Sequence, residues 1–243
     1  MDLLMLGDAV TASEQGSEFF SNLTPPVQIA LLVGALSFAT AVLVSVTAFT
    51  RIIIVLSFVR RALSTQEIPP NQVLMGLSLF MTMFVMAPTF EAIHSNAIVP
   101  FMESAKPVED GGEPAAEFGL DDAVSASVVE LKSFMILNTR TDDLALFFDL
   151  SNTPPPSERL DTPLKIMVPA FIISELKTAF IMGFCIYIPF LLIDLVVSTI
   201  LMALGMMMMP PVVVSTPCKL LLFVLVDGWQ LIAKALVSSF ASA

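Results

Sequence analysis

The sequence predicts an all-α integral membrane-type protein, and three observations lead to this fold class. Apolar residues make up 56% of the 243 residues, charged residues only 14%, and the mean hydropathy is +0.87. Several stretches are long and apolar enough to cross a bilayer core, which takes roughly 20 residues of helix. The acidic excess is concentrated in residues 103–163, with 13 acidic and 4 basic side chains, and is not spread over the chain. This is the pattern of a membrane protein with one acidic loop.

Four stretches qualify as membrane spans. The first two carry no charge, the third carries one acid, and the fourth carries three charged side chains. The predicted spans are Val27–Phe49, Asn71–Phe90, Thr178–Leu204 and Pro217–Phe240.

Residues 1–26 are predicted to be a polar N-terminal extension, because they contain four acids, no base and no sustained apolar run of the kind that a secretory signal has. Residues 27–102 are predicted to form the first helical hairpin. Its connection holds Arg51, Arg60 and Arg61, and the positive-inside rule therefore places that connection in the cytoplasm.

Residues 103–126 have the composition of an acidic, flexible linker. Residues 127–163 are predicted to form a small amphipathic helical region outside the cytoplasm. Ser127 and Glu130 have the spacing of a capping box, and Thr141 marks a second helix start.

Residues 164–243 are predicted to form a second hairpin, broken by proline. Pro169, Pro189 and the pair Pro210–Pro211 each remove a backbone donor, which disturbs a helix. Such breaks are tolerated at membrane depth where protein surrounds the chain, so we expect an assembled, multi-helix body.

Six charged residues near or within apolar stretches are candidates for pairing between helices or subunits: Arg51, Glu175, Lys177, Asp194, Lys219 and Asp227. Asp194 is the strongest candidate, because its side chain is too short to reach the membrane surface. Lys177 and Lys219 could instead extend to the interface and remain solvated.

The stretch "GMMMMPP" places Met206, Met207, Met208 and Met209 between Gly205 and Pro210–Pro211. The glycine and the two prolines predict a loop here and not a helix face. Methionine is flexible and fills irregular gaps, so four in a loop suit a constriction that seals and then yields. The alternative is apolar filler at a helix end that faces lipid.

Enzymatic and nucleic-acid functions have little support. No phosphate-binding loop, nucleophile elbow or metal-binding motif occurs, and the single histidine, His94, has no companion at a useful spacing. We expect no cofactor, no metal and no nucleic-acid partner, since no basic stripe is present. Cys185 and Cys218 are expected to be small apolar residues and not a disulfide.

Two long segments resemble the FliP family of bacterial flagellar type III export gate proteins, which has counterparts in virulence-associated secretion systems. They are "TRIIIVLSFVRRALSTQEIPPNQVLMGLSLFMTMFVMAPTF" and "SELKTAFIMGFCIYIPFLLIDLVVSTILMALGMMMMPPVVVSTPCKLLLFVLVDGWQLIAKALVSSF". Two residues depart from the family pattern: Ile181 replaces an expected glutamine, and Ser64 replaces an expected glycine.

The resemblance implies kinked helical hairpins that wind into a superhelical homopentameric ring in the bacterial inner membrane, within the flagellar basal body. It implies FliQ-type and FliR-type membrane subunits and FlhB-type and FlhA-type export components as partners. Unfolded flagellar subunits would pass through the channel, with Met206–Met209 as its gasket. The flagellar assignment is favoured over the virulence one.

Two other functions remain open. An ion-coupled or small-solute transporter would use Asp194 and the broken helices, but no inverted repeat relates residues 27–90 to 178–240. A passive scaffold for other membrane proteins is the third possibility.

Overall fold

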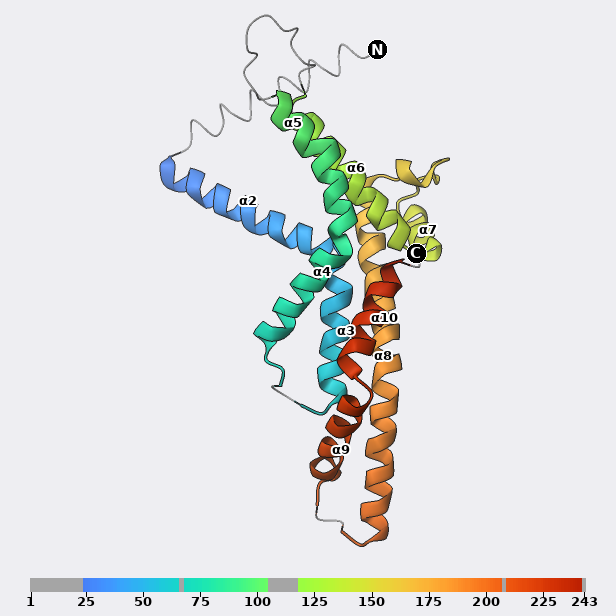
Figure 1. The fold of residues 1–243 in the computed structure, drawn as a ribbon. Coiled ribbons are helices and arrows are strands. Elements are labelled where there is room, and N and C mark those ends of the chain that lie inside the picture. Colours follow the sequence, from blue (N-terminus) through green and yellow to red (C-terminus); the bar gives the residue numbers. More distant parts are fainter. Residues whose placement is uncertain (1–23, 66–67, 105–117, 207–208, 242–243) are drawn as a thin grey trace, which may run out of the picture. The chain divides into compact units, whose positions relative to one another are not determined.

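The computed structural model describes residues 24–65, 68–104, 118–206 and 209–241, and every regular element within them is helical (Figure 1). The chain divides into two compact units, residues 1–44 and 45–243. Most of the predicted N-terminal extension, residues 1–23, lies outside the described residues. The elements are α2 Pro25–Ser45, α3 Phe49–Ala62, α4 Asn71–Ile93, a π-helical turn His94–Ile98, α5 Val99–Ser104, α6 Leu120–Asn138, α7 Thr141–Leu150, a 3₁₀ turn Arg159–Asp161, α8 Leu164–Ala203, α9 Pro211–Leu225 and α10 Gly228–Ala241.

The first unit contains nearly all of α2. The helix starts at two prolines, which fit a first turn because its amides need no intrahelical acceptor. The Thr24 carbonyl accepts from the amides of Val27 and Gln28, at 2.9 and 3.1 Å. Large apolar side chains are exposed on α2, for example Leu32 and Phe38 at 65% and 72%. No polar face balances them, so α2 has the surface of a helix that lipid or protein must cover.

The second unit is built on the packing of α3 against α8 (Figure 1). Ile52, Val55 and Val59 recur on one face of α3 and are fully buried. On α8, Phe171 and Ala179 are equally buried. Spacings of three and four residues place such side chains on one stripe of a helix, so the two stripes form the core of this unit.

α4, the π-helical turn and α5 run on without a break, and α4 contacts both α3 and α6. The buried residues of α4 are Leu74, Ser78, Thr82 and Met86, each four residues after the last. The two hydroxyls donate to carbonyls of their own helix, Ser78 to Leu74 and Thr82 to Ser78, both at 2.7 Å. These bonds leave the stripe free of unpaired donors, so it can be buried in an apolar interface.

The helix after the acidic segment begins earlier than the capping-box pattern predicts. α6 starts at Leu120, and the Asp122 carboxylate accepts from the Gly119 amide at 2.9 Å. Ser127 lies within the helix, where its Oγ donates to the Ala123 carbonyl. Asp121 and Asp122 in the first turn complement the positive end of the helix dipole, which explains why the helix extends back to them. Of the predicted flexible linker, residues 105–117 lie outside the described residues, and the part from Leu120 onward is helical.

The prolines of α8 do not break it. The helix is continuous over 40 residues through Pro169 and Pro189, in contrast to the predicted breaks. A single proline removes one helical hydrogen bond, and neighbouring turns and packing can hold the helix across the gap. The chain does break at the predicted pair Pro210–Pro211, since α8 ends at Ala203 and α9 begins at Pro211, and a further break lies at Asp227, at φ 50°, between α9 and α10.

The described residues contain fewer candidate membrane spans than the four that the sequence predicts. Within the described residues, two helical runs are long and apolar enough to cross a membrane, Asn71–Ser104 and Leu164–Ala203. The pair Pro211–Leu225 and Gly228–Phe240 would make a third span if counted together, although the pair is bent by 64°. At 1.5 Å per residue, the 40 residues of α8 extend about 60 Å, twice the hydrocarbon core of a bilayer.

Candidate functional site: two ion pairs and a methionine loop

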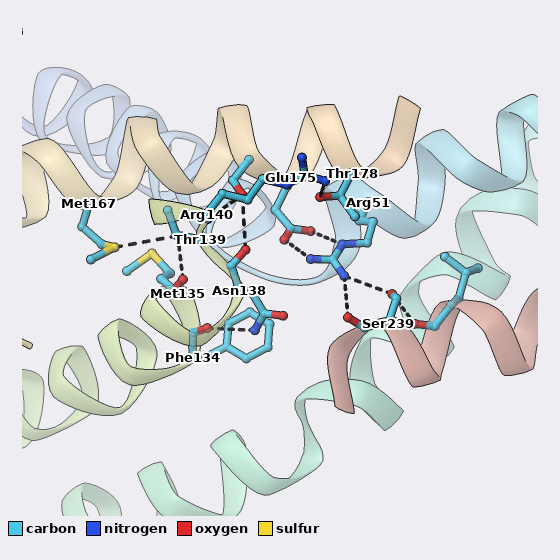
Figure 2. A network of polar contacts seen from close by, with 12 residues as sticks. Arg51, Phe134, Met135, Asn138, Thr139, Arg140, Met167, Glu175, Thr178 and Ser239 are labelled. Atoms are coloured by element: carbon cyan, nitrogen blue, oxygen red, sulfur yellow. Dashed lines mark hydrogen bonds and ion pairs between the residues drawn. The ribbon is translucent and has the colours of Figure 1, made fainter. Parts of the chain in front are cut away.

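Arg51 of α3 and Glu175 of α8 form a buried ion pair (Figure 2). Arg51 Nε donates to Glu175 Oε2 at 2.8 Å, and Nη2 donates to Oε1. Their side chains are only 3% and 0% exposed. Arg51 Nη1 also donates to the carbonyl and to Oγ of Ser239, at 3.1 and 3.0 Å. The guanidinium further lies 3.8 Å from the ring centroid of Phe240. One planar side chain therefore joins α3, α8 and α10.

The turn between α6 and α7 is attached to α8 a few residues from this pair (Figure 2). The Arg140 amide donates to Ser174 Oγ at 3.0 Å, and Arg140 Nη2 donates to Thr178 Oγ1 at 3.3 Å. Ser174 Oγ in turn contacts the Asn138 carbonyl at 3.4 Å. Because Ser174 and Glu175 are adjacent on α8, the ion pair and the turn share one support.

Asp194 of α8 and Lys219 of α9 form the second ion pair, with Nζ and Oδ2 2.6 Å apart. Ser215 Oγ donates to the other carboxylate oxygen, Oδ1, at 2.6 Å. Lys219 Nζ also donates to Ser64 Oγ, directly after α3, at 2.6 Å. The Lys219 side chain is 2% exposed, so the expectation that it extends to a solvated interface is wrong. Its ammonium is retained inside because two oxygen partners replace water.

The loop from Gly205 to Pro210 joins α8 to α9. Gly205 has φ +73°, and its amide donates to the Met202 carbonyl at 3.1 Å. The Met206 amide donates to the Leu201 carbonyl at 3.0 Å, which completes a Schellman turn. Pro210 precedes α9 and Pro211 is its first residue, a position where the missing amide costs nothing. Both ends of the loop therefore have fixed backbone geometry.

Two of the four methionines are described. Met206 is 42% exposed and Met209 is 39% exposed, and the Met209 amide donates to the Met206 carbonyl at 3.4 Å. Met207 and Met208 lie outside the described residues. The visible thioethers are not part of the core of this chain.

The six candidate charges have different fates. Arg51 pairs with Glu175, and Asp194 pairs with Lys219. Lys177 lies 3.6 Å from Asp143 and is 48% exposed, a geometry that contributes little to stability. Asp227 makes no ion pair among the described residues; its backbone forms the turn before α10.

Three contributors were not foreseen in these roles: Ser64, Ser215 and Ser239. A lone serine in an apolar helix most often bonds to its own backbone, as Ser57 does with the Ile53 carbonyl at 2.7 Å. Nothing in the local sequence distinguishes Ser215, whose partner lies 21 residues earlier. The one available sequence signal was the position of Lys219 within an apolar run, because a buried ammonium needs several acceptors.

The described residues include no group of three or more His, Cys, Asp or Glu side chains that could hold a metal ion. Cys185 and Cys218 are exposed and unbonded. Glu175 and Asp194 each have both carboxylate oxygens engaged in hydrogen bonds. The arrangement joins helices at fixed points and presents a loop between two of them.

The chain is similar to known proteins along most of its length. A family model described as the FliP family matches residues 32–236. A flagellar biosynthetic protein FliP from Bacillus subtilis (strain 168) is 51% identical over 219 residues, which cover 90% of this chain and 94% of the relative. A protein of the same name from Buchnera aphidicola subsp. Acyrthosiphon pisum (strain APS) is 47% identical over 93% of this chain and 56% of its own length. Another from Pectobacterium carotovorum subsp. carotovorum is 47% identical over 90% of this chain and 80% of the relative.

Proposed function

The chain belongs to the FliP family, and from that premise we propose that it is a channel-forming subunit of the flagellar type III protein export gate. Five copies form a ring in the bacterial inner membrane, within the basal body. FliQ-type and FliR-type subunits complete the channel, and FlhB-type and FlhA-type components adjoin it. Unfolded flagellar subunits pass through it out of the cytoplasm.

The methionine loop carries this proposal. Its start is set by the Schellman turn at Gly205 and its end by Pro210–Pro211, while Met206 and Met209 are exposed between them. Flexible, apolar thioethers on a loop with fixed ends can close a narrow passage to ions. They can also repack around a polypeptide of any sequence, because methionine adapts to many shapes.

The distribution of apolar surface supports assembly with other subunits. α8 extends about 60 Å and has exposed apolar side chains along it, from Phe180 at 46% to Ile200 at 54%. A bilayer core covers about half of that length. Copies of the chain and partner subunits would cover the rest.

The transporter alternative depends on Asp194 as an ion site. In this chain its Oδ2 accepts from Lys219 and its Oδ1 from Ser215, both at 2.6 Å. A coupling cation would have to displace an ammonium that is already in place. The export-gate function makes no such demand, so it is the better account of Asp194.

The test replaces Met206–Met209 with alanine in cells that make the complete set of export proteins. We expect ion permeability of the membrane to rise, while the purified complex keeps a native mass of five chains plus partners. The control replaces the same four methionines with leucine, because leucine keeps the apolar volume. Unchanged conductance in an intact complex would remove the gasket from the proposal.

A further inference from the structure

α9 is attached to the rest of the chain by one narrow stripe. Its buried residues are Ser215, Lys219 and Phe223, each four residues after the last. Most of the other apolar side chains of α9 are exposed, including Val213 at 63% and Val224 at 72%. Two of the three side chains that hold α9 are therefore polar, and both bond to Asp194.

This stripe is close to the methionine loop along the chain. Ser215 lies one helical turn after Pro211, where α9 begins, and Lys219 lies one turn further on. On the other side of the loop, Asp194 lies 11 residues before Gly205 on the same continuous helix, α8. The ion pair therefore joins the two helices from which the loop is suspended.

Ser64 extends the same network to a third element. It is at φ 57°, directly after α3, in the left-handed region where glycine is relaxed and other residues are strained. Its Oγ accepts from Lys219 Nζ at 2.6 Å. Glycine at this position would remove the backbone strain, but it would also remove the hydroxyl oxygen. The hydrogen bond from Lys219 to that oxygen therefore offsets the strain of a serine in this conformation.

We propose that Lys219, anchored by Asp194 and Ser64, is the positioning residue of the methionine loop, and that Ser64 couples the α3–α4 connection to the loop through it. The role of the loop as a gate rests on the proposed function, whereas the contacts of Lys219 do not depend on it. A displacement of the α3–α4 connection is transmitted through the ammonium to α9, and so to the loop.

The test measures amide hydrogen exchange across residues 211–219 in the purified complex of the full chain, with three variants of one residue. Ser64→Gly relieves the strained backbone and deletes the hydroxyl. Ser64→Ala keeps the strain and deletes the hydroxyl. Ser64→Asn tolerates the left-handed conformation and supplies a side-chain oxygen for Lys219.

We expect exchange in α9 to be about tenfold faster in both Ser64→Gly and Ser64→Ala, and close to the unaltered chain in Ser64→Asn. If Ser64 were only a strained turn residue, Ser64→Gly would slow exchange, the opposite sign. Exchange in α9 should be at least as fast in Lys219→Met as in Ser64→Ala. Exchange in α9 that is unchanged or slower in Ser64→Gly and in Lys219→Met overturns the proposal.

A second measurement separates this proposal from the gate function. In cells that make all export proteins, Ser64→Gly should raise ion leakage, and Ser64→Asn should not. Replacement of Met206–Met209 with alanine could raise ion leakage while Ser64→Gly and Lys219→Met leave it unchanged. The loop would then be a gate, but Lys219 would not position it. If replacement of the methionines also leaves the membrane tight, the gate function fails, and the exchange result alone decides whether Lys219 anchors α9.

Discussion

A β-carbon on Gly183 of α8 would lie 2.6 Å from the ring of Phe58 on α3. Real β-carbons do not approach so closely, and Phe58 Cβ itself would be only 3.1 Å away, so a turn of the ring would not relieve the contact. α3 and α8 therefore touch at a point that has no room for a methyl group.

Gly183→Ala should destabilise the chain by about 1–3 kcal/mol, because overpacking forces α3 and α8 apart. Thermal unfolding of the purified chain in detergent measures this. Gly76→Ala on α4 is the matched control, since its added β-carbon meets nothing within 4 Å. Alanine in that helix interior should be neutral or stabilising by up to about 1 kcal/mol. A Gly183→Ala chain as stable as the control would mean that α3 and α8 are not in this close contact.

Glu175→Gln should cost about 3–5 kcal/mol, because it leaves the buried Arg51 guanidinium without its counter-charge. Arg51→Lys should also be strongly destabilising, since an ammonium cannot reproduce the two-pronged contact with Glu175 and the bonds to Ser239. Arg61→Lys is the control on the same helix, because Arg61 is exposed and its guanidinium lies 5.8 Å from the Phe58 ring centroid. Equal unfolding midpoints for the two arginine variants would contradict the role assigned to Arg51.

Gly205→Ala should cost about 1 kcal/mol through backbone strain alone, because its β-carbon would meet nothing within 4 Å while φ is +73°. Gly205→Asn should cost less, since asparagine also closes helices in this conformation. The measurement is the unfolding midpoint of the two variants side by side. The reverse order, with alanine better tolerated, would show that α8 does not end in a Schellman turn.

Gly228→Ala should distort the junction of α9 and α10, because the added β-carbon would lie 2.3 Å from Cε2 of Phe223. Phe223 and Trp229 pack edge to face at 5.2 Å, and Trp229 is the only tryptophan in the chain. Its fluorescence therefore reports on this junction, and we expect a shift to longer wavelength in the variant. Phe223→Leu in the same chain should restore part of the original emission by making room. An unaltered spectrum for Gly228→Ala would argue against the 64° bend.

The sequence predicts helix content and the methionine loop better than it predicts helix boundaries. Composition and apolar run length fix the all-helical class, because a chain in lipid must satisfy its backbone internally. Gly205 and Pro210–Pro211 mark the loop, because the conformations they favour are local. By contrast, Pro169 and Pro189 suggested breaks that packing overrides. The start of α6 was missed because a carboxylate at Asp122 caps as well as the serine that the pattern favoured.

The sequence predicts that these charged residues form ion pairs, but it does not predict which residue pairs with which. Asp194 within an apolar run requires a partner, and the structure supplies Lys219 from 25 residues further along the chain. That pairing depends on the reversal at the methionine loop and on the register between α8 and α9. Neither the reversal nor the register can be deduced from the residues that flank Asp194 or Lys219. Ser64 is further still, at 155 residues from Lys219.

The length of α8 has a consequence for how the cell must make this protein. Its 40 residues extend further than the hydrocarbon core of a bilayer, so a single copy has apolar surface that lipid does not cover. Such surface leads to aggregation or to removal by proteases. Under the proposed assembly, we expect the number of copies that a cell retains to follow the supply of partner subunits more closely than the rate of synthesis. Copies in excess of their partners are then expected to have a short lifetime, because the exposed surface belongs to the helix itself.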